Sequence, residues 1–142
     1  MTSSTTSITM TQHVAAAPEE VYAAWTEPDE LATWWWPPRM ETSYEMDVRV
    51  GGTYRFRSEV AGIGVHGSYV SLDPPRRLEL TWVWEDGDTD GPEDRVVVEL
   101  EARDGGTLVS VHHTTEAAGA DDFRLGWTDC LARLGELPRL LP

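Results

Sequence analysis

The stretch DDFRLGWTDCLARLGEL, residues 121–137, decides the fold that this sequence predicts. Six of its apolar residues recur at intervals of three and four and so share one face of a helix. They are Phe123, Trp127, Cys130, Leu131, Leu134 and Leu137. At about 1.5 Å per residue this helix spans roughly 25 Å, which is enough to cross a whole β-sheet. Gly126 costs about 1 kcal/mol in a helix relative to alanine, so we expect a close approach of another element there.

The middle of the chain, from residue 44 to residue 115, alternates with the period of two that is typical of β-strands. Gly- and Pro-containing turns separate the alternating runs, and such short connections favour antiparallel neighbours. We therefore predict a meander of about six strands. The side chains expected on one face of these strands are Tyr54, Phe56, Ser58, Val60, Leu78, Leu80, Trp82, Trp84, Val96, Val98, Leu100, Thr107, Val109, Val111 and His113.

A first strand and two short helices are predicted ahead of the meander. Residues 4–14 alternate weakly, with Ile8, Met10 and Val14 on one face. The triplets Pro18-Glu19-Glu20 and Pro28-Asp29-Glu30 each predict a helix start, because proline suits the first position and carboxylates suit the positive end of the helix dipole. We expect the second helix to carry Leu31, Trp34 and Trp35 on its apolar face and to end at Pro37-Pro38. The predicted fold class is α+β, with a curved antiparallel sheet of six to seven strands around a long C-terminal helix.

Length and composition restrict the class of protein. The 142 residues suffice for one domain, which we place at residues 1–142 with residues 1–4 as a disordered tail. Cys130 is the single cysteine, so an intrachain disulfide and a Cys-x-x-Cys metal knuckle are excluded. The formal net charge of −14 disfavours nucleic acid and anionic membrane surfaces as partners. No apolar run is long enough for a membrane span or a signal peptide, which predicts a cytoplasmic location.

The basic residues are all arginine, so the chemistry that depends on lysine is excluded. Without lysine there is no Schiff-base nucleophile, no lysine-anchored pyridoxal phosphate and no P-loop lysine. We expect no cofactor and no metal.

Two glycine-containing motifs resemble ligand loops but have the wrong surroundings. Residues 62–67, GIGVHG, match the G-x-G-x-x-G pattern of dinucleotide sites, yet a strand-like run follows them where a helix is required. They therefore predict a glycine-rich hairpin. Residues 86–91, DGDTDG, match the first half of a calcium loop, but Val97 occupies the position of the bidentate glutamate. We interpret this motif as the solvated tip of an acidic hairpin, residues 85–94, and leave calcium or a protein partner as alternatives.

A series of motifs spread over nearly the whole chain carries a family resemblance. They are APEEVYAAWTEPDEL (17–31), WWWP (34–37), VGGTY (50–54), GSY (67–69), DPPRRL (73–78), TW (81–82), GT (106–107) leading to His113, and GWTDCL (126–131). In this order they resemble the SRPBCC superfamily (START and birch-pollen-allergen-like), and within it the group similar to the heat-shock-protein-90 ATPase activator. The resemblance implies a helix-grip fold with a hydrophobic-ligand cavity between the sheet and the long helix. Relatives include lipid carriers, polyketide cyclases, resistance proteins and co-chaperone domains.

The histidines offer candidate acid–base groups. His112 and His113 are adjacent on a predicted strand, so they point to opposite faces and cannot bind one metal ion together. His113 shares its face with Val109 and Val111, which predicts an inward, hydrogen-bonded core histidine. The same position would also allow it to exchange protons with a ligand. We do not assign His66 to either face of the sheet, because the apolar residues around it do not alternate regularly.

Seven tryptophans are many for this length, and they either fill the interior or line a cavity. We expect Trp25 and Trp127 in the core and at least one of Trp34, Trp35 and Trp36 exposed at the cavity mouth or at a dimer contact. For Trp82 and Trp84 the sequence does not decide between lining a cavity and filling the core. The predicted ligand-binding residues are Trp35, Tyr54, Phe56, His66, Tyr69, Trp82, Trp84, Val98, Val111, His113, Phe123, Trp127 and Leu131.

These observations favour a non-catalytic protein that binds a hydrophobic or aromatic small molecule between the sheet and the C-terminal helix. The first alternative is a cofactor-independent cyclase, dehydratase or isomerase similar to the polyketide cyclases. In that case His113 or His66 would move protons and Tyr54 or Tyr69 would polarise a carbonyl. The second alternative is a stress-related module that contacts a protein through exposed tryptophans or the acidic hairpin. A monomer and a homodimer are both compatible with the sequence.

Overall fold

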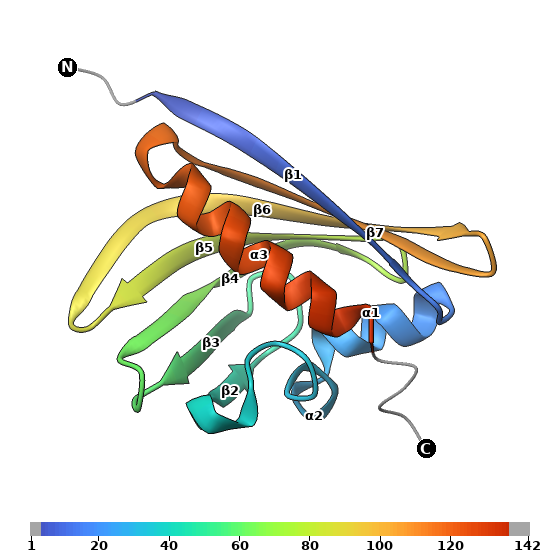
Figure 1. Ribbon diagram of the computed structural model, residues 1–142, viewed down its shortest axis with the longest axis horizontal. Coiled ribbons are helices and arrows are strands. Elements are labelled where there is room, and N and C mark those ends of the chain that lie inside the picture. Colours follow the sequence, from blue (N-terminus) through green and yellow to red (C-terminus); the bar gives the residue numbers. More distant parts are fainter. Residues whose placement is uncertain (1–3, 137–142) are drawn as a thin grey trace.

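A curved antiparallel sheet of seven strands forms the body of the protein, as the computed structural model of residues 4–136 shows (Figure 1). Its strand order is β1-β7-β6-β5-β4-β3-β2. The strands are β1 (Thr5–Val14), β2 (Ser43–Met46), β3 (Thr53–Ser58), β4 (Ile63–Asp73), β5 (Arg77–Asp86), β6 (Thr89–Arg103) and β7 (Gly106–Glu116). Strands β2 to β7 follow one another as a meander, and β1 pairs with β7 at the other edge. The predicted sheet is confirmed.

One long helix, α3 (Ala120–Leu134), lies across the concave side of the sheet (Figure 1). Its inner face carries Trp127, Cys130, Leu131 and Leu134, all buried, as the spacing predicts. Two short helices, α1 (Pro18–Thr26) and α2 (Pro28–Leu31), follow β1. The α+β helix-grip arrangement is therefore confirmed. Leu137, expected on the long helix, and residues 1–3 of the expected tail lie outside the described residues.

The second helix is shorter than predicted. It ends at Leu31, and the chain then turns, so Trp34, Trp35 and Trp36 lie in a turn. The reason is packing: successive helical residues point about 100° apart, whereas this turn buries Trp34 and Trp35 side by side. The indole Nε1 of Trp34 also donates a hydrogen bond to the carbonyl oxygen of Ala24 at 2.9 Å.

The strand faces match the predicted alternation, with one exception. Ile8, Val98 and Val111 are among the inner side chains that are almost completely buried. Val60 was expected on the inner face but is 66% exposed, because β3 ends at Ser58 and residues 59–62 form the turn to β4.

Both glycine-containing motifs are hairpins. The motif at residues 62–67 begins in the β3–β4 turn, where Gly62 has a φ of +71°, and continues as strand β4. The acidic motif forms the tight β5–β6 turn, with Gly87 at a φ of +63° and Asp86 paired with Thr89. Among residues 4–136, no three His, Cys, Asp or Glu side chains are grouped so that they could hold a metal ion. In the same range, no helix has the length and apolarity to cross a membrane.

Candidate functional site

Tryptophan rings connect the sheet, the turn after α2 and helix α3. All seven belong to one set of ring contacts, with centroid distances from 4.8 to 6.5 Å between successive members. They are Trp25, Trp34, Trp35, Trp36, Trp82, Trp84 and Trp127. This aromatic network lies in the interior between the sheet and α3.

One end of the interior is packed. Near α1 and α2 the space between the layers shrinks to a void of about 20 Å³, which has room for about one water molecule. We call this region the packed end. The residues around the void are Trp25, Leu31, Trp35, Tyr54, Phe56, Tyr69, Leu78, Leu80, Trp82, Val96 and Trp127.

The other end of the interior holds a pocket of about 420 Å³, which we call the open pocket. This volume lies within the range of roughly 300–1,000 Å³ that is usual for small-molecule sites. Helix α3, the turn after α2 and strand β5 supply its walls. The lining residues are Trp35, Trp36, Trp82, Trp84, Asp86, Gly119, Asp122, Phe123, Gly126, Trp127 and Cys130.

Gly126 explains why α3 leaves room for this pocket. A Cβ atom at this position would find no other atom within 4 Å, apart from those of its chain neighbours and of the helix backbone. The close approach that we expected at Gly126 is therefore wrong. The glycine instead exposes the helix backbone to the pocket, and any larger side chain there would point into open space.

The aromatic walls of the open pocket meet at steep angles. The ring of Trp84 is inclined by 83° to Trp36 and by 82° to Phe123, with centroids 6.1 and 6.2 Å away. Trp82 lies deeper and is nearly parallel to Trp84. Trp36 is half-buried at the pocket, so it is the most exposed of the three neighbouring tryptophans 34–36.

Helix α3 fixes the position of the tryptophan turn through Arg133 and Cys130. The guanidinium of Arg133 donates to the carbonyl oxygens of Trp34 and Trp35 at 2.9 and 2.6 Å. The thiol of Cys130 donates to the Trp35 carbonyl at 3.2 Å. Burial raises the pKa of Cys130 to about 12, so the sulfur keeps the proton that this hydrogen bond requires. These contacts fix the backbone at Trp35, whose ring borders both the packed end and the open pocket.

His113 lies behind the pocket wall, and both of its ring nitrogens are engaged. Its Nδ1 accepts a hydrogen bond from the indole of Trp127 at 2.9 Å, and since that indole only donates, Nε2 carries the proton. Nε2 donates to Asp94 Oδ2 at 2.8 Å. Burial lowers the pKa of His113, although Asp94 opposes this effect. The neutral ring is fully buried and, in this state, holds Trp127 in place.

Tyr54 and Tyr69 lie at the packed end. The hydroxyl of Tyr54 donates to the carbonyl oxygen of Thr81 at 2.6 Å. Burial raises the pKa of both tyrosines, so both are protonated near neutral pH. Neither side chain lines the open pocket.

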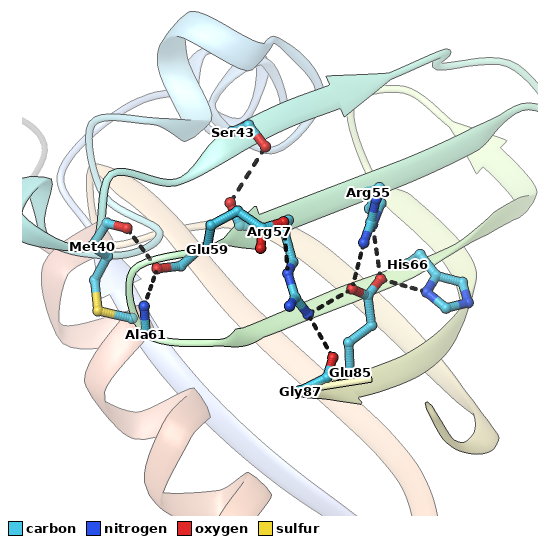
Figure 2. A network of polar contacts seen from close by, with 10 residues as sticks. Met40, Ser43, Arg55, Arg57, Glu59, Ala61, His66, Glu85 and Gly87 are labelled. Atoms are coloured by element: carbon cyan, nitrogen blue, oxygen red, sulfur yellow. Dashed lines mark hydrogen bonds and ion pairs between the residues drawn. The ribbon is translucent and has the colours of Figure 1, made fainter. Parts of the chain in front are cut away.

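On the outer side of the sheet, a buried carboxylate gathers three basic groups (Figure 2). Glu85 accepts two hydrogen bonds from Arg55, both at 3.0 Å, one from Arg57 at 3.1 Å and one from His66 Nδ1 at 2.7 Å. Burial opposes the ionisation of Glu85, but the hydrogen bonds from Arg55 and His66 outweigh it and lower its pKa to about 2. This outer network ties strands β3, β4 and β5 together.

The outer network also positions the pocket wall. Glu85 stands between Trp84 and Asp86 on β5, and both of these neighbours line the open pocket. Holding Glu85 from outside therefore fixes the part of β5 that carries them. The sequence pattern gave no sign of this network, because it depends on the strand register that pairs Arg55 with His66 and Gly64 with Glu85.

The predicted ligand-binding residues fall into four groups. Those that line the open pocket are Trp35, Trp82, Trp84, Phe123 and Trp127. Those that surround only the small void are Tyr54, Phe56 and Tyr69. Val98, Val111, Leu131 and His113 are buried in the core and line neither space, and His66 lies on the outer face. The list of predicted ligand-binding residues did not include Trp36, Asp86, Gly119, Asp122, Gly126 and Cys130. The sequence signal for Trp36 was its place among three adjacent tryptophans that cannot all face inward.

The comparisons with known proteins agree with the fold. The family model described as activator of Hsp90 ATPase homolog 1-like protein matches residues 15–138. No curated protein matches. Among solved structures, CalU16 from Micromonospora echinospora is 28% identical, with a TM-score of 0.71 over 91% of this chain and 73% of that one. CV1439 from Chromobacterium violaceum is 26% identical, with a TM-score of 0.75 over 92% and 96% of the two chains.

A third structure extends the likeness of fold. DynU16, from the dynemicin biosynthetic locus, is 20% identical and has a TM-score of 0.79. The match covers 94% of this chain and 47% of DynU16. With the family model spanning most of its length and the helix-grip architecture in place, the chain belongs to the activator of Hsp90 ATPase homolog 1-like family of the SRPBCC superfamily.

Proposed function

We propose that the protein binds a hydrophobic or aromatic small molecule in the open pocket. The observation that carries the proposal is the volume of about 420 Å³ between α3 and β5, walled by aromatic rings and left open by Gly126. Aromatic surface gives a flat or apolar ligand a large contact area. All seven tryptophans are buried or half-buried, which favours a small ligand over a protein partner.

Two tryptophans that border both the packed end and the open pocket have indole donors without a partner. The indole Nε1 atoms of Trp35 and Trp82 are buried and have no hydrogen-bond partner among the described residues. An unpaired buried donor costs about 1–3 kcal/mol. A ligand oxygen that displaced one ring slightly would supply the missing partner.

Binding fits the pocket better than catalysis by one of the two candidate histidines does. A cyclase, dehydratase or isomerase needs a group that exchanges protons with its substrate. Both nitrogens of His113 are occupied by Asp94 and Trp127, and His66 is on the other side of the sheet. The titratable groups that line the pocket are Asp86, Asp122 and Cys130, and Cys130 is held as a thiol.

Titration with the neutral fluorophore N-phenyl-1-naphthylamine tests the proposal. We expect its fluorescence to rise on binding and tryptophan emission to fall. In the Gly126→Phe variant the new ring would occupy the pocket, so the affinity should drop at least about tenfold, the effect of losing roughly 1.4 kcal/mol of binding energy.

Gly126→Ala is the matched control. It adds one methyl group and removes the helix cost of glycine, so it should bind the fluorophore and gain up to about 1 kcal/mol of stability. Equal affinity in the wild type and in Gly126→Phe, with the variant folded by circular dichroism, would show that the pocket is not the binding site.

A further inference from the structure

The open pocket combines its aromatic walls with negative charge. Asp86 at the end of β5 and Asp122 in the first turn of α3 are both exposed and line it. No arginine is among the described residues that line the pocket, and the chain contains no lysine. The charged side chains that line the open pocket are therefore both carboxylates.

These two carboxylates differ from the acidic residues on the outer face of the sheet. There, Glu79 pairs with Arg77 and Arg95, and Glu85 pairs with Arg55 and Arg57. Within residues 4–136, Asp86 and Asp122 have no ion pair and no side-chain hydrogen bond. The chain has 11 arginines against 25 acidic residues, and the four arginines that pair with Glu79 and Glu85 lie on the outer face of the sheet, not at the pocket.

The aromatic walls favour the same sign of ligand charge. The face of an indole ring carries negative electrostatic potential, and a cation placed over it gains about 0.5–2 kcal/mol. Rings set at steep angles to one another, as Trp84 is to Trp36 and Phe123, can present surfaces to such a cation from more than one direction. A cation between these rings and the two carboxylates would be stabilised by both.

We propose that the ligand of the open pocket is an organic cation with an aromatic or apolar body, such as an arylalkyl ammonium compound. The proposal rests on the proposed function and names the charge of its ligand. The apolar body would lie against Trp82 and Phe123, and the charged nitrogen would lie toward Asp86 and Asp122.

Three probes of nearly identical shape separate charge from hydrophobic contact. They are benzyltrimethylammonium, its neutral carbon analogue neopentylbenzene, and the anion phenylmethanesulfonate. Each is titrated at low ionic strength, where exposed charges are least screened, by its quenching of tryptophan fluorescence. We expect the cation to bind about tenfold more tightly than the neutral analogue, and the anion to bind most weakly.

The carboxylates are tested by the double variant Asp86→Asn/Asp122→Asn. It should reduce the advantage of the cation to about threefold, since the ring contacts remain, and leave the neutral analogue unaffected. Asp121→Asn/Asp129→Asn is the matched control, because it removes the same charge from exposed positions of α3 outside the pocket. It should keep the full preference.

The outcomes distinguish the inference from the proposed function. If the neutral analogue binds as tightly as the cation, and Gly126→Phe blocks it, the charge assignment is wrong and the pocket is still the binding site. If both double variants lose the preference equally, net charge rather than the pocket carboxylates is responsible, and the inference is also overturned. If no probe binds in a way that depends on Gly126, the proposed function itself fails.

Discussion

The two ends of the space between the sheet and α3 are built from the same kind of residue, yet one is filled and the other is hollow. At the packed end, the Trp34 indole donates a hydrogen bond to the Ala24 carbonyl, and its ring centroid lies 4.8 Å from that of Trp25. A void of only about 20 Å³ remains there. At the open pocket, Gly126 presents no side chain and about 420 Å³ remains. A large number of tryptophans therefore does not by itself make a cavity. Whether the space beside the rings is filled depends on the residue that faces them.

The largest difference between the two ends should appear in their response to the loss of a ring. Trp25→Ala removes a buried indole from the packed end, so we expect it to lower the free energy of unfolding by about 3–5 kcal/mol. Trp84→Ala removes a half-buried ring beside a pocket that is already open, so we expect a loss of about 1 kcal/mol. Urea unfolding measures both values.

Ligand binding should rank the same two variants in the opposite order. Trp84→Ala removes a wall of the open pocket and should weaken N-phenyl-1-naphthylamine, whereas folded Trp25→Ala should bind it almost normally. Equal losses of stability in the two variants would contradict the division of the interior into a packed and an open end.

A smaller loss of stability is expected when the outer network that supports the wall of the open pocket is broken. Glu85→Gln breaks the buried ion pairs with Arg55 and Arg57 beneath Trp84 and Asp86, and we expect it to cost roughly 3 kcal/mol at pH 7. In the wild type, the pKa of Glu85 is about 2, well below its usual value. The stability that Glu85 contributes is therefore complete above about pH 5 and is lost as the pH falls toward 2.

The deficit of Glu85→Gln relative to the wild type should accordingly shrink between pH 5 and pH 2, as measured by urea unfolding at each pH. Glu59→Gln is the control, because Glu59 also pairs with Arg57 but its side chain is 79% exposed. We expect that variant to stay within about 1 kcal/mol of the wild type. A constant deficit of Glu85→Gln over this pH range would refute the role assigned to its ionised form.

The fold could be predicted from sequence because the side-chain period specifies which face each element buries. Residues 121–137 and the alternating strands identify the helix and the sheet that must meet. The period could not predict at which residue a helix or strand ends when side-chain packing favours a turn. Val60 continues the alternation but lies in a turn, and Trp34 and Trp35 leave the helix so that both can be buried.

The site could be predicted only in part. Periodicity predicts that Trp82, Trp84 and Phe123 point inward. It does not predict whether an inward side chain lies at the packed end or at the open pocket. Tyr54 and Tyr69 share the inner face and still lie at the packed end. The contacts of His113 with Asp94 and Trp127, and those of Glu85 on the outer face, join residues far apart in sequence, so they follow only once strand register is known.

A crystal structure of the protein with N-phenyl-1-naphthylamine bound tests the central claim most directly. We expect the aromatic rings of the ligand beside Gly126, between Trp84 and Phe123, with the packed end unchanged. Ligand density that pushes Tyr54 and Tyr69 apart at the packed end, or that lies only on the outer surface, would contradict the account.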